Sequence, residues 1–199
     1  MVSQNVSHPA VGSAEHSSAR AMVMVGSVLA LLGAITVFGW SFLNWDDSPR
    51  EVITGPGEIV GCILATAGSI LLILGLPRVL VGVAAWAIAA SVIGLAFVLV
   101  DTWYHATVAV ALANELNDAT FDAIYESGWV FLFSLPKMLL CLMGFVGVAV
   151  SGWRTGLISR PLCVLLAVGG VVSLVPPFMP GVLVSSIAFL LIAHASRGR

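Results

Sequence analysis

Long stretches of apolar residues constrain this chain more than any motif that it carries. The first, from Ala21 to Leu43, contains no charged side chain, and about 20 residues at 1.5 Å each cross roughly 30 Å of hydrocarbon. Across the chain 59% of the residues are hydrophobic, 9% are charged and the mean hydropathy is +1.07. Soluble domains do not use residues in this way. The sequence therefore predicts an all-α, polytopic membrane bundle.

We expect six transmembrane helices, arranged as three hairpins within one domain over 21–195. The predicted spans are 21–43, 59–76, 79–100, 128–150, 162–175 and 181–195. The last two are near the lower limit of spanning length, so a re-entrant hairpin or one broken helix is an alternative for 162–195. The remaining segments are predicted as a flexible tail (1–20), an acidic outer loop (101–127) and a basic C-terminus (196–199).

The charged residues indicate how these helices are oriented, because basic residues in short loops stay on the cytoplasmic side. With six spans and both termini inside, one basic residue faces outward, Arg50. The arginines that then face the cytoplasm are Arg20, Arg78, Arg154, Arg160, Arg197 and Arg199. A five-span chain would place the last two outside. We therefore predict cytoplasmic termini and a location in the cell membrane. The excess of arginine over lysine favours a bacterial plasma membrane.

The chain's only lysine, Lys137, interrupts the fourth apolar segment directly after Pro136. Counted from Gly128 at helical rise, it lies about 14 Å below the outer boundary of the bilayer. An ammonium costs about 3 kcal/mol there on insertion scales. We therefore expect its stem to reach a carboxylate, either Asp101 at the outer end of the third span or Glu58 at the start of the second.

Two interpretations compete for this group, which His105 joins because it follows Asp101 by one helical turn. The first is a structural ion pair that fixes the register of the helices. The second is a working site, in which Lys137 holds an anionic headgroup or a carboxylate, or exchanges a proton with Asp101 as a substrate moves. The other spans carry too few polar residues to line an aqueous pore.

Acidic residues gather in the outer loop. At 100° per residue, one side of a helix would carry Glu115, Asp118, Asp122 and Glu126. This pattern predicts a surface-lying amphipathic helix. Its acidic face is interpreted as a docking surface for a basic partner, as a weak cation site, or as the solvated side of a helix at the headgroups.

Other motifs do not indicate chemistry. Three cysteines stand alone on separate apolar segments and are predicted to be reduced packing residues: Cys62, Cys141 and Cys163. Asp101 and His105 are spaced for one helix face, but two ligands do not make a metal site. We therefore expect no metal, no cofactor and no catalytic residue. The net charge of −2 offers no basic surface for nucleic acid.

These observations favour a non-enzymatic scaffold or accessory subunit of a membrane complex. Its partners would be the lipid bilayer and other membrane proteins, bound through small-residue helix faces or the acidic outer loop. Such small residues recur at Gly26 and Ala30 and at Gly61 and Ala65. The alternative is a small transporter, or a lipid- or anion-binding protein, that uses Lys137 with Asp101 or Glu58. An outer-face enzyme that uses Asp101 and His105 is a third hypothesis.

Overall fold

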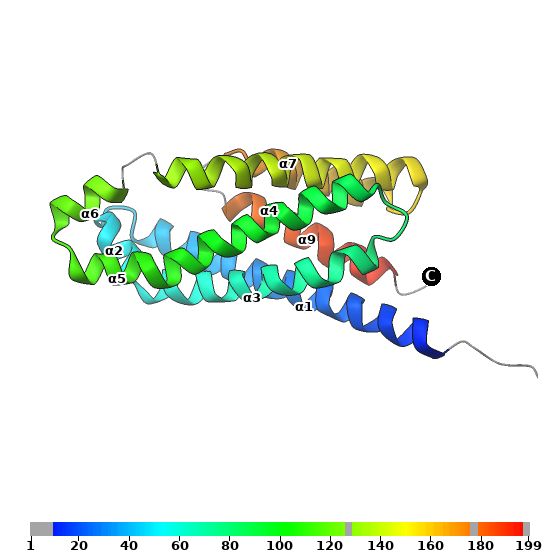
Figure 1. Cartoon of the computed structure of the whole chain (residues 1–199), viewed down its shortest axis with the longest axis horizontal. Coiled ribbons are helices and arrows are strands. Elements are labelled where there is room, and N and C mark those ends of the chain that lie inside the picture. The colour runs from blue at the N-terminus through cyan, green and yellow to red at the C-terminus, as the bar shows by residue number, and fades with distance from the viewer. Residues whose placement is uncertain (1–9, 126–128, 176–178, 197–199) are drawn as a thin grey trace, which may run out of the picture.

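The computed structural model describes residues 10–125, 129–175 and 179–196, which fold into helices without a strand (Figure 1). The helices are α1 (Ala10–Leu43), α2 (Pro49–Thr54), α3 (Pro56–Val79), α4 (Ala85–Tyr104), η1 (His105–Ala109), α5 (Val110–Glu115), α6 (Asp118–Tyr125), α7 (Trp129–Thr155), α8 (Arg160–Val172) and α9 (Met179–Ala195). The segment η1 is a π-helical stretch that continues α4 into α5. The predicted all-helical class is confirmed.

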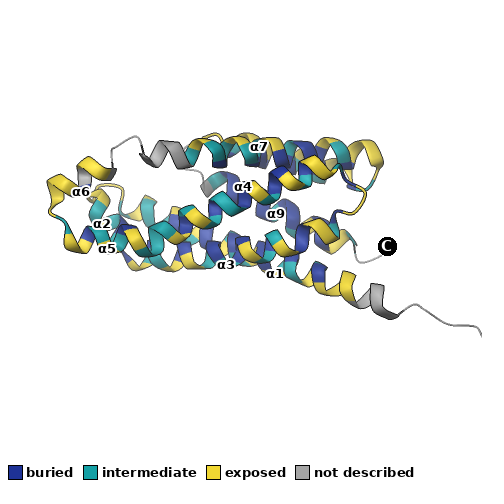
Figure 2. Ribbon diagram, viewed as in Figure 1, coloured by how far each residue is buried: buried dark blue, intermediate teal, exposed yellow. Residues whose placement is uncertain are grey.

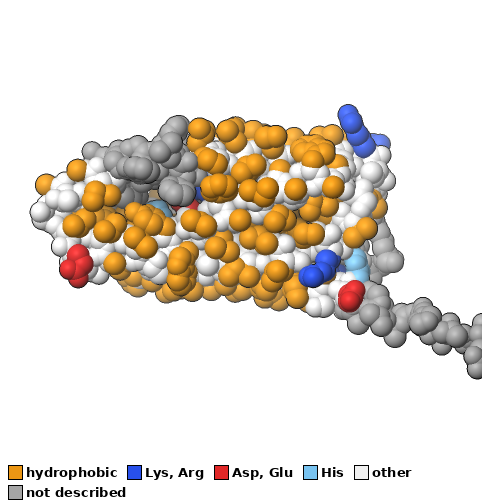
Figure 3. Space-filling model, in the orientation of Figure 1, with side chains coloured by type: hydrophobic (Ala, Val, Ile, Leu, Met, Phe, Trp, Pro, Cys, Tyr) orange, Lys and Arg blue, Asp and Glu red, His pale blue; other side chains and the backbone are white. Residues whose placement is uncertain are grey.

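Four helical segments of the described chain are long and apolar enough to cross a membrane. They are Glu15–Leu43, Pro56–Val79, Ala85–Glu115 and Ser134–Thr155, and α8 and α9 are shorter apolar helices. Apolar side chains cover the flank of the molecule between its two ends (Figure 3). Exposed residues of this kind include Phe38, Ile63 and Leu139. A soluble protein rarely exposes so continuous an apolar surface, so these are the properties of a helical membrane protein.

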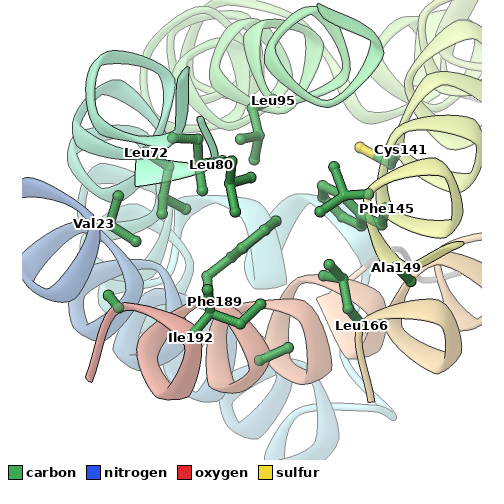
Figure 4. Close-up of a cluster of buried hydrophobic side chains, with 14 of the residues drawn as sticks. Val23, Leu72, Leu80, Leu95, Cys141, Phe145, Ala149, Leu166, Phe189 and Ile192 are labelled. Carbon is green, nitrogen blue, oxygen red and sulfur yellow. The ribbon is translucent and has the colours of Figure 1, made fainter. Parts of the chain in front are cut away.

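Six helices form a closed ring. In the order α1, α3, α4, α7, α8 and α9, each helix packs on the next, and α9 returns to α1. Each long helix turns one face inward and leaves the other exposed (Figure 2). Inside the ring, the phenyl groups of Phe145 and Phe189 meet edge to face at 5.3 Å. Leu72, Leu80 and Leu95 surround them (Figure 4).

Small residues allow the ring to close. A Cβ atom on Gly33 would lie 2.6 Å from the carbonyl oxygen of Gly61, and one on Gly68 would lie 2.5 Å from the amide nitrogen of Ala30. The small-residue faces of α1 and α3 are therefore occupied inside the bundle. Contacts with another protein through small residues would have to use other surfaces of the chain.

The short helices α2, α5 and α6, together with η1, form a cap over one end of the ring, which we call the outer cap after the predicted outer loop. The cap has its own small core of Ile53, Ala109, Ala113 and Phe121. Trp40 at the end of α1 donates its indole N–H to the carbonyl of Val52, at 3.1 Å. The cap is also held by an exposed ion pair between Arg50 and Asp118.

Two segments that were predicted to lie outside the membrane spans contain helices in the structure. Residues 10–20 of the predicted flexible tail belong to α1, while residues 1–9 lie outside the described chain. No proline separates Ala10 from Leu43, and extending an existing helix adds one hydrogen bond for each residue that is fixed. The predicted outer loop 101–127 contains the end of α4, η1, α5 and α6. The helix that begins at Ala85 therefore continues through η1 and α5 beyond the apolar segment that was predicted to span the membrane.

The prediction of one continuous amphipathic helix in the outer loop is wrong, because the segment is divided between two helices. Leu116 has an extended backbone, with φ −94° and ψ 154°. The side chain of Asn117 accepts a hydrogen bond from the amide of Thr120 at 3.0 Å, which begins a new helix. Glu115 and Asp118 therefore lie on different helices. The side chain of Asp122, and Glu126 as a whole, lie outside the described residues.

The boundaries of the second and third spans also differ from prediction. α3 continues through Pro77 to Val79, because a proline in the last turn interrupts little of the helix. The turn that follows contains Gly82 with φ +91°, a conformation that favours glycine. The next helix, α4, therefore begins at Ala85 and not at Val79.

Candidate functional site

Lys137 lies inside the bundle and contacts a carboxylate of a neighbouring helix. It occupies α7 directly after Pro136, and only 4% of the residue is exposed. Its Nζ atom lies 2.6 Å from Oδ2 of Asp101 on α4. The side chain of Asp101 is 20% exposed. Of the two carboxylates expected from the sequence, the structure therefore places Asp101 against the ammonium.

A second ionisable pair lies beside the first. Oε1 of Glu58 is 3.4 Å from Nδ1 of His105, and the side chains are 8% and 19% exposed, respectively. The thiol of Cys62 lies one turn below on α3 and donates to the same carboxylate oxygen, at 3.6 Å. Nδ1 of His105 is buried and has no hydrogen-bond partner among the described residues. The Glu58–His105 contact is thus an ion pair when the imidazole is protonated.

Local helix geometry positions these groups. Glu58 lies in the first turn of α3, where the helix dipole favours a negative charge. Asp101 and His105 are one turn apart, and the amide of His105 bonds to the carbonyl of Asp101. The ring of Tyr104 meets the imidazole edge to face at 5.8 Å. Because the π-helical segment begins at His105, the imidazole stands at the point where the helix widens.

Below the ionisable groups, two hydroxyls join α3 to α4. The side-chain oxygens of Thr66 and Thr102 are 2.8 Å apart, and both residues are buried. Thr102 donates to the carbonyl of Val98 at 3.0 Å. When its single hydroxyl hydrogen is used there, Thr66 is the donor in the bond between the two residues.

We call Glu58, Cys62, Asp101, His105 and Lys137 the outer polar cluster. With His105 neutral, it contains two carboxylates and one ammonium, so it carries one excess negative charge among the described residues. A charge that is removed from water must be compensated within the protein. One proton bound by the Glu58–His105 pair supplies the compensation, because the net charge of the cluster is then zero.

The acidic residues of the cap do not join this cluster. Glu115 and Asp118 are exposed, and Asp118 pairs with Arg50 on α2. Within the described ranges, no three His, Cys, Asp or Glu side chains are grouped so as to hold a metal ion.

Sequence reasoning missed one member of the cluster and the two hydroxyls below it. Cys62 was interpreted as a packing residue, and neither Thr66 nor Thr102 was considered. A signal was present on α3, since Glu58, Cys62 and Thr66 follow one another at intervals of four residues and share a helix face. The pairing of Glu58 with His105 had no comparable signal, because it depends on how α3 meets η1.

Comparisons with protein-family models, with curated proteins and with solved structures gave no match. The interpretation of the site therefore depends on its own geometry and charges.

Proposed function

We propose that this chain is a non-enzymatic, multi-pass component of a membrane that binds and releases a proton at the outer polar cluster. In this role it responds to the pH on the side of the membrane that the outer cap faces. One observation carries the proposal, namely the excess carboxylate of a mostly buried cluster that also contains a histidine. A structural ion pair needs only Lys137 and Asp101. Glu58 and His105 add a second pair, whose charge changes when one proton binds.

A proton suits the cluster better than a metal ion does. Asp101 is already in contact with Lys137, which repels a second cation. A proton on His105 converts the 3.4 Å contact with Glu58 into a charge-assisted interaction. The other titratable groups of the cluster are Cys62 on α3, Asp101 on α4 and Lys137 on α7, and the ring of Tyr104 meets the imidazole. Arg50 on α2 pairs with Asp118 of the cap.

The rest of the bundle favours a site that is reached from one side of the membrane. It does not favour a path that carries a substrate across. Between the cluster and the opposite end, the interior is filled with buried apolar residues such as Leu72, Leu76 and Phe189. A cavity of about 200 Å³ at that opposite end is lined by other residues, among them Leu80, Val83 and Ile192. The transporter hypothesis would need a polar path through this apolar half.

We also propose that all six helices of the ring cross the membrane, with the arginine-bearing end in the cytoplasm. The start of α1 and the end of α9 lie at the same end of the molecule (Figure 1). The order of the helices places three further arginines at this end: Arg78 near the end of α3, Arg154 near the end of α7 and Arg160 at the start of α8. Lys137 is 17 residues before Arg154 on α7, or about 26 Å by helical rise. The cluster thus lies near the outer boundary of a roughly 30 Å core.

The orientation is tested by labelling single cysteines in intact cells. Ala119 on α6 and Ser159 before α8 are both exposed, whereas the three native cysteines are buried. We expect a membrane-impermeant maleimide to label Ala119→Cys from outside, and Ser159→Cys only after the cells are opened. Labelling of both positions from the same side would contradict the proposed topology.

The proton site is tested by unfolding the protein in mixed micelles at pH 5.5 and pH 8. The wild-type cluster carries one excess negative charge when His105 is neutral, and binding of one proton neutralises it. We therefore expect the free energy of unfolding to be higher at pH 5.5 by about 1 to 2 kcal/mol from this pair. Glu58→Gln removes the excess charge and should remove this pH dependence.

The matched control is Glu115→Gln, which changes an exposed carboxylate on the cap. This variant should keep the wild-type difference between the two pH values. A Glu58→Gln protein whose stability changes with pH in parallel with the wild type would show that the cluster is only a structural ion pair.

A further inference from the structure

A small cavity lies in the middle of the helix ring, away from the outer polar cluster. Five helices line it, and its apolar walls include Leu72, Leu95, Cys141, Phe145 and Phe189, whose side chains converge in Figure 4. The space open to a water-sized sphere is about 10 Å³. This volume is close to the roughly 10–15 Å³ that one water molecule requires.

Three serine hydroxyls also line this cavity. They belong to Ser69 on α3 and to Ser185 and Ser186 on α9, which are 1%, 4% and 2% exposed. Ser185 donates to the carbonyl of Gly181 at 2.7 Å. Its hydrogen is thus used, while its oxygen still has a lone pair to offer. In the described part of the chain, no side-chain hydrogen bond of Ser69 or Ser186 is found.

We propose that the cavity is a binding site for a single water molecule, held by these three serines. Ser69 and Ser186 donate their hydroxyl hydrogens to the water, and the water donates one of its own to the oxygen of Ser185. A buried water typically makes about three hydrogen bonds to polar groups that would otherwise be unsatisfied. A hydroxyl that is buried without a partner costs about 1 to 3 kcal/mol, whereas an apolar cavity of this size would remain dry.

The water connects two helices that are not adjacent in the ring. α3 packs on α1 and α4, whereas α9 packs on α1 and α8. A molecule bonded to Ser69 on one side and to Ser186 on the other therefore joins α3 to α9 across the interior. The site is independent of the proposed proton binding. Ser69 lies three residues beyond Thr66 on α3, which is about 5 Å further from the cluster.

The experiment measures the midpoint of thermal unfolding in mild detergent for Ser69→Ala, Ser186→Ala and the double variant. We expect each single substitution to lower the midpoint by about 2 to 4 °C. The double variant should lose no more than the larger single loss, because one water serves both hydroxyls. Ser91→Ala is the control, since its hydroxyl is equally buried but bonds to the carbonyl of Ala87 at 2.9 Å. Its effect should add independently to that of Ser69→Ala.

Two results would overturn the proposal. A dry cavity predicts the opposite sign, because alanine then removes a buried hydroxyl that has no partner, and the midpoint stays constant or rises. Additive losses from Ser69→Ala and Ser186→Ala would show that the two hydroxyls act separately. An experimental density map gives a direct reading. We expect one peak between the three serine oxygens, and its absence at a resolution that shows other ordered waters counts against the site.

Discussion

Replacing Lys137 with methionine is expected to destabilise the folded protein by about 3 kcal/mol. Methionine fills a similar volume but leaves Asp101 without the ammonium that lies 2.6 Å from it. The outer polar cluster would then carry two excess negative charges when His105 is neutral. Because Asp101 is 20% exposed, water relieves part of this cost, so we expect the lower end of the range for a broken buried pair. The free energy of unfolding in mixed micelles measures the effect.

The rescue experiment combines Lys137→Met with Asp101→Asn. Removing both charges restores the original net charge of the cluster, so most of the lost stability should return. Arg78→Gln is the matched control, because Arg78 is an exposed cation near the opposite end of the bundle. Its removal should cost less than about 0.5 kcal/mol. If the double variant is as unstable as Lys137→Met alone, then the loss does not come from the unpaired carboxylate.

The contact of Lys137 with Asp101 was one of two that we predicted from the sequence. The prediction needed only the free-energy cost of placing an ammonium group in hydrocarbon. The chain has one lysine, and few carboxylates lie near the level of its head group once the apolar segments are taken as helices. The same reasoning offered Glu58 as an equal candidate. The choice between the two carboxylates depends on which helices are neighbours, and α7 packs on α4. Ring order is a property of the whole bundle, so sequence alone leaves it open.

The depth of Lys137 in the bilayer was harder to predict than the carboxylate that it contacts. Counting from Gly128 placed Lys137 near the middle of the bilayer, whereas counting from Arg154 under the proposed topology places it near the outer boundary. The two counts differ because α7 extends over 27 residues, which is more than a roughly 30 Å core requires. A helix that is longer than the membrane gives no internal mark of where the boundary lies. The arginines provide a better reference, since their cost keeps them outside the hydrocarbon.

The outer cap illustrates a different limit of sequence reasoning. The apolar residues that hold it together, Ile53, Ala109, Ala113 and Phe121, come from four short helical segments. Only the segment around α6 showed a helical periodicity in the sequence, and the other segments are too short to show one, since isolated short helices are marginal. Their stability comes from tertiary contacts, such as the bond from Trp40 to Val52. Helices of this kind become predictable only when the packing is known.

Glycine substitutions on α1 should separate helix propensity from helix packing by their opposite signs. A Cβ atom on Gly33 would lie 2.6 Å from both the carbonyl oxygen of Gly61 and the amide nitrogen of Ala65, whereas one on Gly39 would meet nothing within 4 Å. Backbone atoms cannot rotate away as a side chain can, so Gly33→Ala must push α1 and α3 apart. We expect a loss of about 1 to 3 kcal/mol in the free energy of unfolding. Gly39→Ala should instead gain about 0.5 to 1 kcal/mol, because alanine favours the helix.

The comparison is controlled internally, because both variants make the same chemical change in the same helix. Equal effects at the two positions would show that α1 and α3 do not approach as closely as the structure indicates. This prediction also concerns the outer polar cluster, because Gly33 contacts α3, and α3 carries Glu58 and Cys62. We therefore expect Gly33→Ala to weaken the dependence of stability on pH that Glu58 and His105 produce. Gly39→Ala should preserve it, and a pH dependence that is unchanged in Gly33→Ala would show that the cluster tolerates displacement of α3.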